Sequence, residues 1–180
     1  FWFFKQVRDW MKDKNKRNKQ GEDVVKAHFY VTKSGQLNNA DETLTQTHSE
    51  YQYVFSSILK YHNSDTISTS ESFNLANSIR RMLEAFSSFK TASNGGFNAV
   101  LQLGLDKGYD QQQKERIYYF LNKYSHLDRI ESFDNTVETL LEEGVNVVND
   151  VLMIIKLIDE DHYKFMLKAC NFEDKLIPLN

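Results

Sequence analysis

The stretch Phe73–Lys90, which reads FNLANSIRRMLEAFSSFK, decides the fold predicted for this chain. Its apolar residues recur at every third or fourth position, so in an α-helix they lie along one side. That apolar stripe consists of Leu75, Ile79, Met82, Phe86 and Phe89. The opposite side of the helix carries Asn77, Arg80, Arg81 and Glu84. The stretch therefore predicts an amphipathic helix, whose polar side is either a solvated surface or a site.

The composition of the 180-residue chain predicts a folded, mainly helical protein. Hydrophobic residues make up 41% of it and aromatic residues 13%, which is enough to build a core. One proline and seven glycines leave few helix breakers. The formal net charge of −3 gives no basic field over the whole molecule, so binding to a nucleic acid would need a local basic patch.

Cysteine content and hydropathy limit the cellular compartments in which the protein is expected. Cys170 is the sole cysteine, which excludes an internal disulfide and a cysteine-based zinc site. No apolar run approaches the ~18 residues of a membrane span, so no membrane partner is expected. These features fit a reducing cytoplasm. Because the chain starts at Phe1 without an initiator methionine, we expect it to be part of a longer protein.

The N-terminal quarter mixes helix and strand signals. A helix is predicted over residues 1–11, where apolar residues again share one side. β-branched and aromatic residues predict a strand over Val24–Lys33. Its hydrogen-bonding partner could be a strand outside this chain, because one strand cannot satisfy its own backbone groups. The polar segment Gln36–Thr47 is expected to be irregular.

Helices account for the rest of the predicted structure. After a cap at Thr47 or Ser49, one helix is expected to end near His62–Asn63, and the polar linker Ser64–Ser72 leads to the central helix. Gly144 is predicted to be a weak point between two helical segments. The remaining helices are expected over Ala99–Leu105, Gln111–Tyr124, Phe133–Leu141, Val145–Leu157 and a last short segment that starts at the acidic cluster Asp159–Asp161.

A cluster of positive charge lies near the N-terminus. The segment Lys12–Gly21 has no apolar residue and is expected to be a solvated, mobile loop. The alternative is a loop that contacts RNA phosphates, which would make binding salt-dependent. Its basic residues are Lys12, Lys14, Lys16, Arg17 and Lys19, and Arg81 on the central helix is a further candidate for RNA contact.

Common catalytic and nucleotide-binding motifs are missing from these 180 residues. They contain no P-loop, no Gly-rich dinucleotide fingerprint, no HExxH and no GxSxG. His126 with Asp128, and the segment Asp159–His162, could each ligate a metal, but helix capping and solvation explain both more simply. We therefore expect no metal and no cofactor in this chain.

Arg80, Glu84 and His126 are the residues that could carry chemistry. The plain interpretation is an exposed ion pair, which adds only about 0.3–0.5 kcal/mol, and an unrelated histidine. Arg80 precedes Glu84, which is the less stabilising order on a helix. The functional interpretation is a metal-free ribonuclease site, in which the 2′-hydroxyl of RNA attacks the adjacent phosphate. Arginine would hold that phosphate, while histidine and glutamate would supply the acid and the base.

Five stretches between Phe1 and about His126 form a family pattern. They read FWFFKQVRDW, HFYVTK, SEYQYVFSSIL, NLANSIRRMLEAFSSFK and RIYYFLNKYSH. Together they resemble the C-terminal part of the ABC-type ATPases grouped with the PrrC and RloC anticodon nucleases. The SEYxYxF and RRxLExFxxFK patterns are the most specific. The sequence departs from relatives at TAS after FSSFK, where they tend to have a Tyr-Pro-like turn, and no motif follows Ile130.

The resemblance implies that the nucleotide-binding motifs, with ATP and Mg²⁺, lie in an ATPase head that precedes this chain. The chain would then not hydrolyse ATP unaided, and its strand at His28–Lys33 would complete the sheet of the head. PrrC-like proteins carry an Arg-x3-Glu pair followed by a more distant His, and they cut tRNA at the anticodon. Arg80 and Glu84 match the pair, and His126 is the natural third member.

The combined prediction is a mainly α, irregular multi-helix domain with one or two short N-terminal edge strands. Residues 1–45 would be the end of the ATPase head, and residues 46–180 a helical C-terminal domain. We expect a cytoplasmic bacterial protein whose partners are tRNA and the ATPase head of the same polypeptide, with a homodimer as a further option. The alternative function is a non-catalytic module for interaction or dimerisation, which would expose a contiguous apolar patch.

Overall fold

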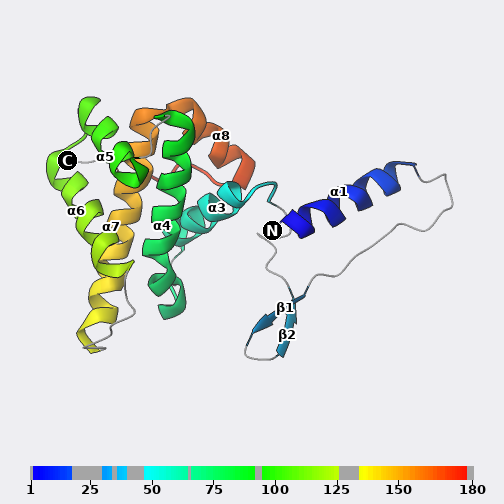
Figure 1. Ribbon diagram of the computed structural model, residues 1–180. Coiled ribbons are helices and arrows are strands. Elements are labelled where there is room, and N and C mark those ends of the chain that lie inside the picture. Colours follow the sequence, from blue (N-terminus) through cyan, green and yellow to red (C-terminus); the bar gives the residue numbers. More distant parts are fainter. Residues whose placement is uncertain are drawn as a thin grey trace. The chain divides into compact units, whose positions relative to one another are not determined.

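The computed structural model describes residues 2–17, 30–33, 36–39, 47–64, 66–91, 95–125 and 134–177. The chain forms two compact units, Phe1–Tyr53 and Val54–Asn180. Both are mainly helical in their described parts, and the N-terminal unit contains two short strands (Figure 1). The predicted mainly α fold with short N-terminal strands is confirmed. The origin of residues 1–45 from an ATPase head stays a prediction.

Helix α1, Trp2–Arg17, is longer than the sequence predicts. The predicted loop over Lys12–Gly21 is wrong for its first six residues, because the helix continues to Arg17. Lysine and arginine are good helix formers, and no glycine or proline interrupts the segment before Gly21. The basic cluster therefore begins on a helix.

Two short strands form an antiparallel pair in the N-terminal unit. β1 is Tyr30–Lys33, the end of the predicted strand, and β2 is Gln36–Asn39. The irregular structure predicted there is wrong for β2, whose polar side chains give no strand pattern. β1 therefore has a hydrogen-bonding partner within the chain. The place of this strand in the sheet of an ATPase head stays a prediction. The register pairs Tyr30 with Asn39, Val31 with Asn38, Thr32 with Leu37 and Lys33 with Gln36.

Helix α3, Glu50–Asn63, has the predicted end and a capped start. Ser49 Oγ accepts a hydrogen bond from the backbone N–H of Gln52 at 3.0 Å, which confirms Ser49 as the cap. Just before this cap, the guanidinium of Arg8 donates to the carbonyl oxygen of Thr47. Within the N-terminal unit, this side chain ties α1 to the start of α3.

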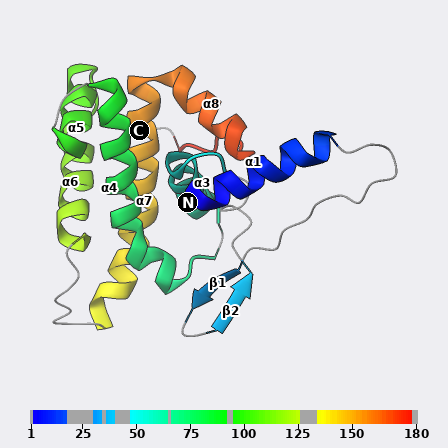
Figure 2. The same ribbon diagram turned by 45° about the vertical axis from the view of Figure 1, so that its right-hand side comes forward.

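The C-terminal unit contains, in its described part, most of α3 and five further helices. α4 packs against α5, α6 and α7, and α7 also packs against α5, α6 and α8. Figures 1 and 2 show α4 and α7 side by side, with α5 and α6 along one flank. The bounds are α4 Thr69–Lys90, α5 Gly96–Asp106, α6 Gln111–Tyr124, α7 Asp134–Ile158 and α8 Glu160–Cys170.

The core of this unit is built around the apolar stripe of α4. Four of the five predicted members of that stripe are almost fully buried, and Ile79, Met82 and Phe86 are 0% exposed. The prediction is wrong for Phe89, whose side chain is 52% exposed, because it lies in the last turn of α4 and projects past the core. α7 supplies the facing apolar residues Val147, Val148, Val151, Leu152, Ile154 and Ile155.

Helix α4 begins four residues before the predicted start at Phe73. Ser68 and Glu71 form a capping box, in which Ser68 Oγ accepts from the N–H of Glu71 at 3.2 Å. Glu71 Oε2 in turn accepts from the N–H of Ser68 at 3.0 Å. The linker prediction is therefore wrong from residue 69 onward. Helix α6 has its predicted bounds. Helix α5 starts three residues before the predicted Ala99.

Helix α7 passes through Gly144 without a break, so the predicted weak point is wrong. The missing side chain serves packing. A Cβ at Gly144 would lie 2.6 Å from the hydroxyl oxygen of Tyr61 and 3.0 Å from Cδ2 of Leu75, both of which are buried. Glycine here lets α7 approach α3 and α4 closely. In the described part of the chain, no helix is long and apolar enough to cross a membrane.

The substitution Gly144→Ala is expected to destabilise the protein even though alanine is the better helix former. Alanine would gain about 1 kcal/mol in helix propensity. Overpacking against Tyr61 and Leu75 costs about 1–3 kcal/mol in well-packed cores. We expect a net loss of up to about 2 kcal/mol in the free energy of unfolding, measured by urea denaturation.

The matched control is Asn146→Ala, two residues further along α7 at an exposed position. This change should alter the free energy of unfolding by no more than about 0.5 kcal/mol in the destabilising direction. If Gly144→Ala is as stable as Asn146→Ala, the close approach at Gly144 does not limit the packing.

Candidate functional site on helix α4

Arg80 and Glu84 form an ion pair on the polar side of α4. Nε of Arg80 donates to Oε1 of Glu84 at 2.9 Å, as their spacing of four residues predicts. Their side chains are 35% and 43% exposed. The pair is therefore held in one geometry and still open to a solute from solvent.

The first turn of α5 lies beside this pair. The ring of Phe97 lies under the guanidinium of Arg80, with Cζ 5.4 Å from the ring centroid. Gly96 lies against Glu84, since a Cβ at Gly96 would be 3.9 Å from Cγ of Glu84. Gly96 has a φ of +57°, which glycine adopts without strain. The position of α5 beside the pair could not be read from the periodicity of α4.

The predicted triad stays a prediction, because His126 lies outside the described residues. Helix α6 ends at Tyr124 and is closed by Ser125, whose N–H donates to the carbonyl oxygen of Leu121. The structure thus brings together Arg80 and Glu84. The third member of the predicted site stays a prediction.

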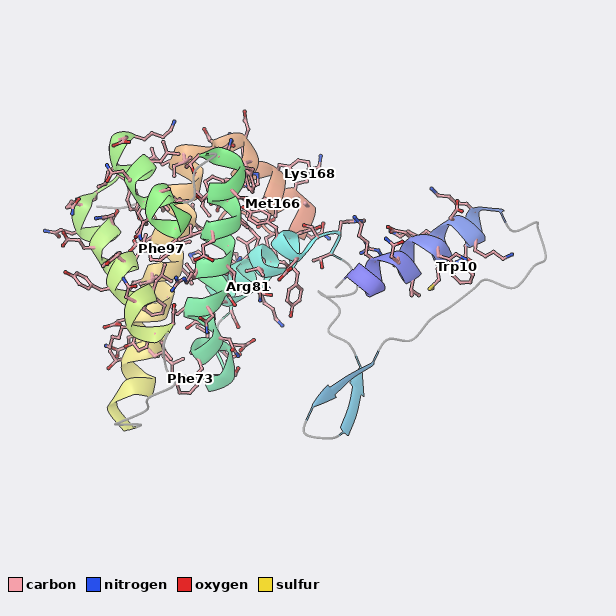
Figure 3. The ribbon with its side chains drawn as sticks, in the orientation of Figure 1. Trp10, Phe73, Arg81, Phe97, Met166 and Lys168 are labelled. Carbon is pink, nitrogen blue, oxygen red and sulfur yellow. The ribbon has the colours of Figure 1, made fainter. Side chains whose placement is uncertain are left out.

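The candidate RNA-contacting residues fall on two helices, one in each unit. Arg81 is exposed on α4, next to Arg80 in sequence (Figure 3). Lys12, Lys14 and Lys16 are exposed on α1. Arg17 is the last residue of α1, and Lys19 lies outside the described residues. Contact of any of these residues with RNA stays a prediction.

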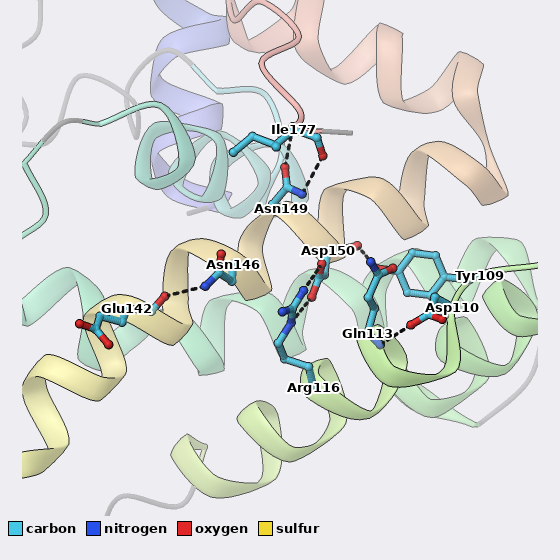
Figure 4. Close-up of polar contacts among 9 residues, drawn as sticks. All are labelled: Tyr109, Asp110, Gln113, Arg116, Glu142, Asn146, Asn149, Asp150 and Ile177. Atoms are coloured by element: carbon cyan, nitrogen blue, oxygen red, sulfur yellow. Dashed lines mark hydrogen bonds and ion pairs between the residues drawn. The ribbon is translucent and has the colours of Figure 1, made fainter. Parts of the chain in front are cut away.

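An ion pair with a buried carboxylate, which the sequence did not predict, joins α6 to α7 (Figure 4). Arg116 donates to both carboxylate oxygens of Asp150, at 2.6 and 2.8 Å. The Asp150 side chain is 1% exposed and that of Arg116 is 44% exposed. Burial raises the pKa of the Asp150 carboxyl, and the Arg116 guanidinium opposes that rise. An aspartate within the apolar run from Val145 to Leu157 was the available signal.

Asp150 also anchors the turn between α5 and α6. The buried hydroxyl of Tyr109 donates to its backbone carbonyl oxygen at 2.8 Å. Burial, and then the nearby Asp150 charge, raise the pKa of Tyr109 well above its usual value, so the hydroxyl remains a donor. The arrangement fixes α6 against α7, which makes it a scaffold contact and not a reactive group.

The C-terminal segment is fixed to α7 by Asn149 (Figure 4). Its side-chain oxygen accepts from the N–H of Ile177 at 2.9 Å, and its amide group donates to the carbonyl oxygen of Ile177 at 3.2 Å. Nε2 of His62 on α3 lies 3.3 Å from the same Asn149 oxygen. One buried side chain therefore joins α3, α7 and the segment after α8.

The acidic segment Asp159–His162 begins α8, as the capping interpretation predicts. Asp159 accepts from the N–H of His162 at 2.9 Å and forms an ion pair with Lys90. The His162 ring lies 5.4 Å from Phe86, and its burial lowers the pKa of the imidazole. Among the described residues, no group of three or more histidine, cysteine or acidic side chains is placed to hold a metal ion.

Removing Arg116 should cost far more than removing an exposed lysine, because Asp150 would remain buried and unpaired. We expect Arg116→Ala to lower the free energy of unfolding by about 2–4 kcal/mol, less than for a fully buried pair because Arg116 is partly exposed. The control Lys164→Ala breaks an exposed pair with Glu160 and should cost no more than about 1 kcal/mol.

The loss in Arg116→Ala should also depend on pH. Without the guanidinium, burial and then the nearby Asp110 charge raise the pKa of Asp150 above its value in the unfolded chain. The folded protein therefore binds the extra proton, and its stability falls as pH rises through that raised pKa. The deficit relative to wild type should be larger at neutral pH than near pH ~4 in urea titrations. An equal deficit at both pH values would show that Asp150 does not stay buried.

One comparison with known proteins finds a match. The family model AAA_13, described as AAA domain, matches residues 1–153, most of the chain. No curated protein and no solved structure matches the chain significantly. The matched range contains α4, its Arg80–Glu84 pair, and α5 and α6 beside it. The chain belongs to the AAA domain family.

Proposed function

We propose that this chain is the C-terminal effector of an ABC-type ATPase and cleaves RNA without a metal ion. The observation that carries the proposal is the Arg80–Glu84 pair, which is fixed at 2.9 Å and open to solvent on a family-matched helix. The resemblance of the same helix to anticodon nucleases of the PrrC and RloC group supports tRNA as the substrate. Arg80 precedes Glu84, which is the less stabilising order on a helix. This order and the partial exposure of both side chains fit a pair that binds a ligand.

Cleavage in this proposal uses a nucleophile that RNA itself supplies. A base removes the proton from a 2′-hydroxyl, and that oxygen attacks the adjacent phosphorus. The bond from phosphorus to the 5′-oxygen breaks, and an acid protonates the leaving oxygen. Glu84 and His126 share these two proton transfers. Arg80 stabilises the charge that develops on the phosphate.

The geometry of Arg80 suits the phosphate. In the described part of the chain, Glu84 takes the Nε of Arg80, so both Nη groups are left for phosphate oxygens. The ring of Phe97 supports the guanidinium from α5. The exposed lysines of α1 would contact RNA phosphates as well, and such contacts weaken with salt. ATP and Mg²⁺ belong, in this proposal, to a head that lies outside these 180 residues and controls cleavage.

The test is tRNA cleavage by the complete protein with ATP, comparing wild type with Arg80→Ala, Glu84→Gln and His126→Ala. Positioned acid–base groups contribute about 10²–10⁴-fold to a rate, so each of the last two variants should lose cleavage by that factor. Arg80→Ala should lose at least ~10²-fold, the size of one lost transition-state contact. The Arg80 and Glu84 variants should still fold, because an exposed pair adds no more than about 1 kcal/mol. A melting curve checks the folding of His126→Ala.

The matched control is the Glu160–Lys164 pair on α8, which has the same spacing and a distance of 2.8 Å. Glu160→Gln and Lys164→Ala should leave cleavage unchanged. Unchanged cleavage in all three site variants would remove the assignment of the site. ATP is supplied with Mg²⁺, so the need for a metal ion must be measured in a variant that cleaves RNA without ATP. If that variant cleaves RNA only after a divalent ion is added, the metal-free reaction is contradicted.

A second candidate is a non-catalytic interaction module, favoured by exposed aromatic residues in the C-terminal unit. Phe165 on α8 is 68% exposed and Phe89 on α4 is 52% exposed. Large exposed aromatic side chains commonly mark contact surfaces. This candidate gains support if the complete protein cleaves no RNA and if Phe165→Glu changes its oligomeric state in sedimentation experiments.

A further inference from the structure

Two neighbouring tyrosines of α6 are exposed on the side that adjoins the Arg80 pair. Tyr118 is 40% exposed and Tyr119 is 66% exposed. Their ring centroids are 5.8 Å apart, with the rings nearly perpendicular at 76°. Exposed ring faces are hydrated at a cost in free energy, and adjacent exposed rings are more typical of a contact surface than a single ring is.

A continuous row of contacts leads from Arg80 to these tyrosines. Cζ of Arg80 lies 5.4 Å from the ring centroid of Phe97. The Phe97 ring lies 6.3 Å from the Tyr118 ring, with 38° between their planes. Phe97 is 5% exposed, so it links the arginine to the tyrosines from beneath. The surface therefore presents a cation at one end and two aromatic rings at the other.

This combination matches the chemistry of unpaired nucleotides. Single-stranded RNA is bound through stacking of its bases on aromatic rings and through cations on its phosphates. Bases within a duplex are already stacked and cannot reach such rings. Lys123 lies four residues after Tyr119 on α6, and its ammonium group is 4.7 Å from the centroid of the Tyr124 ring. It adds a positive charge to the same helix.

We propose that Tyr118 and Tyr119 form a stacking platform for unpaired bases of a single-stranded RNA whose phosphate Arg80 holds. The proposal rests on the proposed function, because the role of Arg80 as the phosphate-binding residue is taken from the cleavage reaction. It adds binding residues to that function, because the two tyrosines would hold unpaired bases next to the phosphate that Arg80 binds. An exposed protein partner on the same tyrosines is the competing outcome.

The test measures binding apart from cleavage. The probe is a short, fluorescein-labelled single-stranded RNA with 2′-O-methyl groups, which lacks the 2′-hydroxyl nucleophile, and its affinity is read by fluorescence anisotropy. Stacking of one base on one aromatic ring corresponds to a loss of about fivefold to 150-fold in affinity on alanine substitution. Tyr119→Ala should show a loss in this range, and Tyr119→Phe should bind within about twofold of wild type, because phenylalanine keeps the stacking face.

The matched control is Phe165→Ala, since Phe165 on α8 is as exposed as Tyr119. It should bind the probe like wild type. Tyr118→Ala should also weaken binding, and its melting curve checks that the loss is not caused by unfolding, because Tyr118 touches Phe97. Binding of the same sequence as a duplex should be weaker than binding of the single strand.

The platform is overturned if Tyr119→Ala binds like wild type, if Tyr119→Phe is as weak as Tyr119→Ala, or if the wild-type chain binds no single-stranded RNA. Cleavage by the complete protein that survives in Tyr119→Ala, together with unchanged probe binding, removes the platform and leaves the nuclease. Tyrosine-dependent binding without any cleavage by the complete protein removes the nuclease and leaves the platform as an RNA-binding surface.

Discussion

The packing of α4 against α7 is the constraint on which the C-terminal unit depends. Ile79, Met82 and Phe86 are fully buried, and burying one such side chain stabilises the fold by about 1.5–3 kcal/mol. Because the apolar side of α4 is committed to this contact, its polar side must face outward at a fixed angle. The direction of Arg80 and Glu84 is thus set by core packing and not by the ion pair itself.

The same core determines what lies around the candidate site. Helix α5 packs on α4 and brings Phe97 under Arg80, while α6 packs on both α4 and α7. The buried Arg116–Asp150 pair then fixes how α6 is rotated relative to α7, since a bidentate contact has one favourable orientation. The outward position of Tyr118 and Tyr119 follows from that rotation. The contact between Arg116 and the buried Asp150 therefore determines which side chains α6 exposes to solvent.

Amphipathic spacing predicted the long helices of this chain but not their contacts. The stripe of α4 and the bounds of α6 follow from the 3.6-residue period, which is a local property. Gly144 and β2 were mispredicted because tertiary packing and backbone pairing override local preference there. The Arg80–Glu84 contact needed only spacing along one helix, whereas Phe97 and Asp150 act across helices. Contacts between helices depend on relative rotation, which a single sequence does not reveal.

The clamp that Asn149 forms on Ile177 has a mechanical consequence. The side chain holds both backbone groups of one residue, much as a neighbouring strand would. Tension applied at the segment after α8 therefore enters the unit near the middle of α7, one residue before Asp150. From there it reaches α3 through His62 and α6 through Arg116. A displacement of Ile177 would therefore act on α7 at the residue next to the one that holds the helix with the tyrosines.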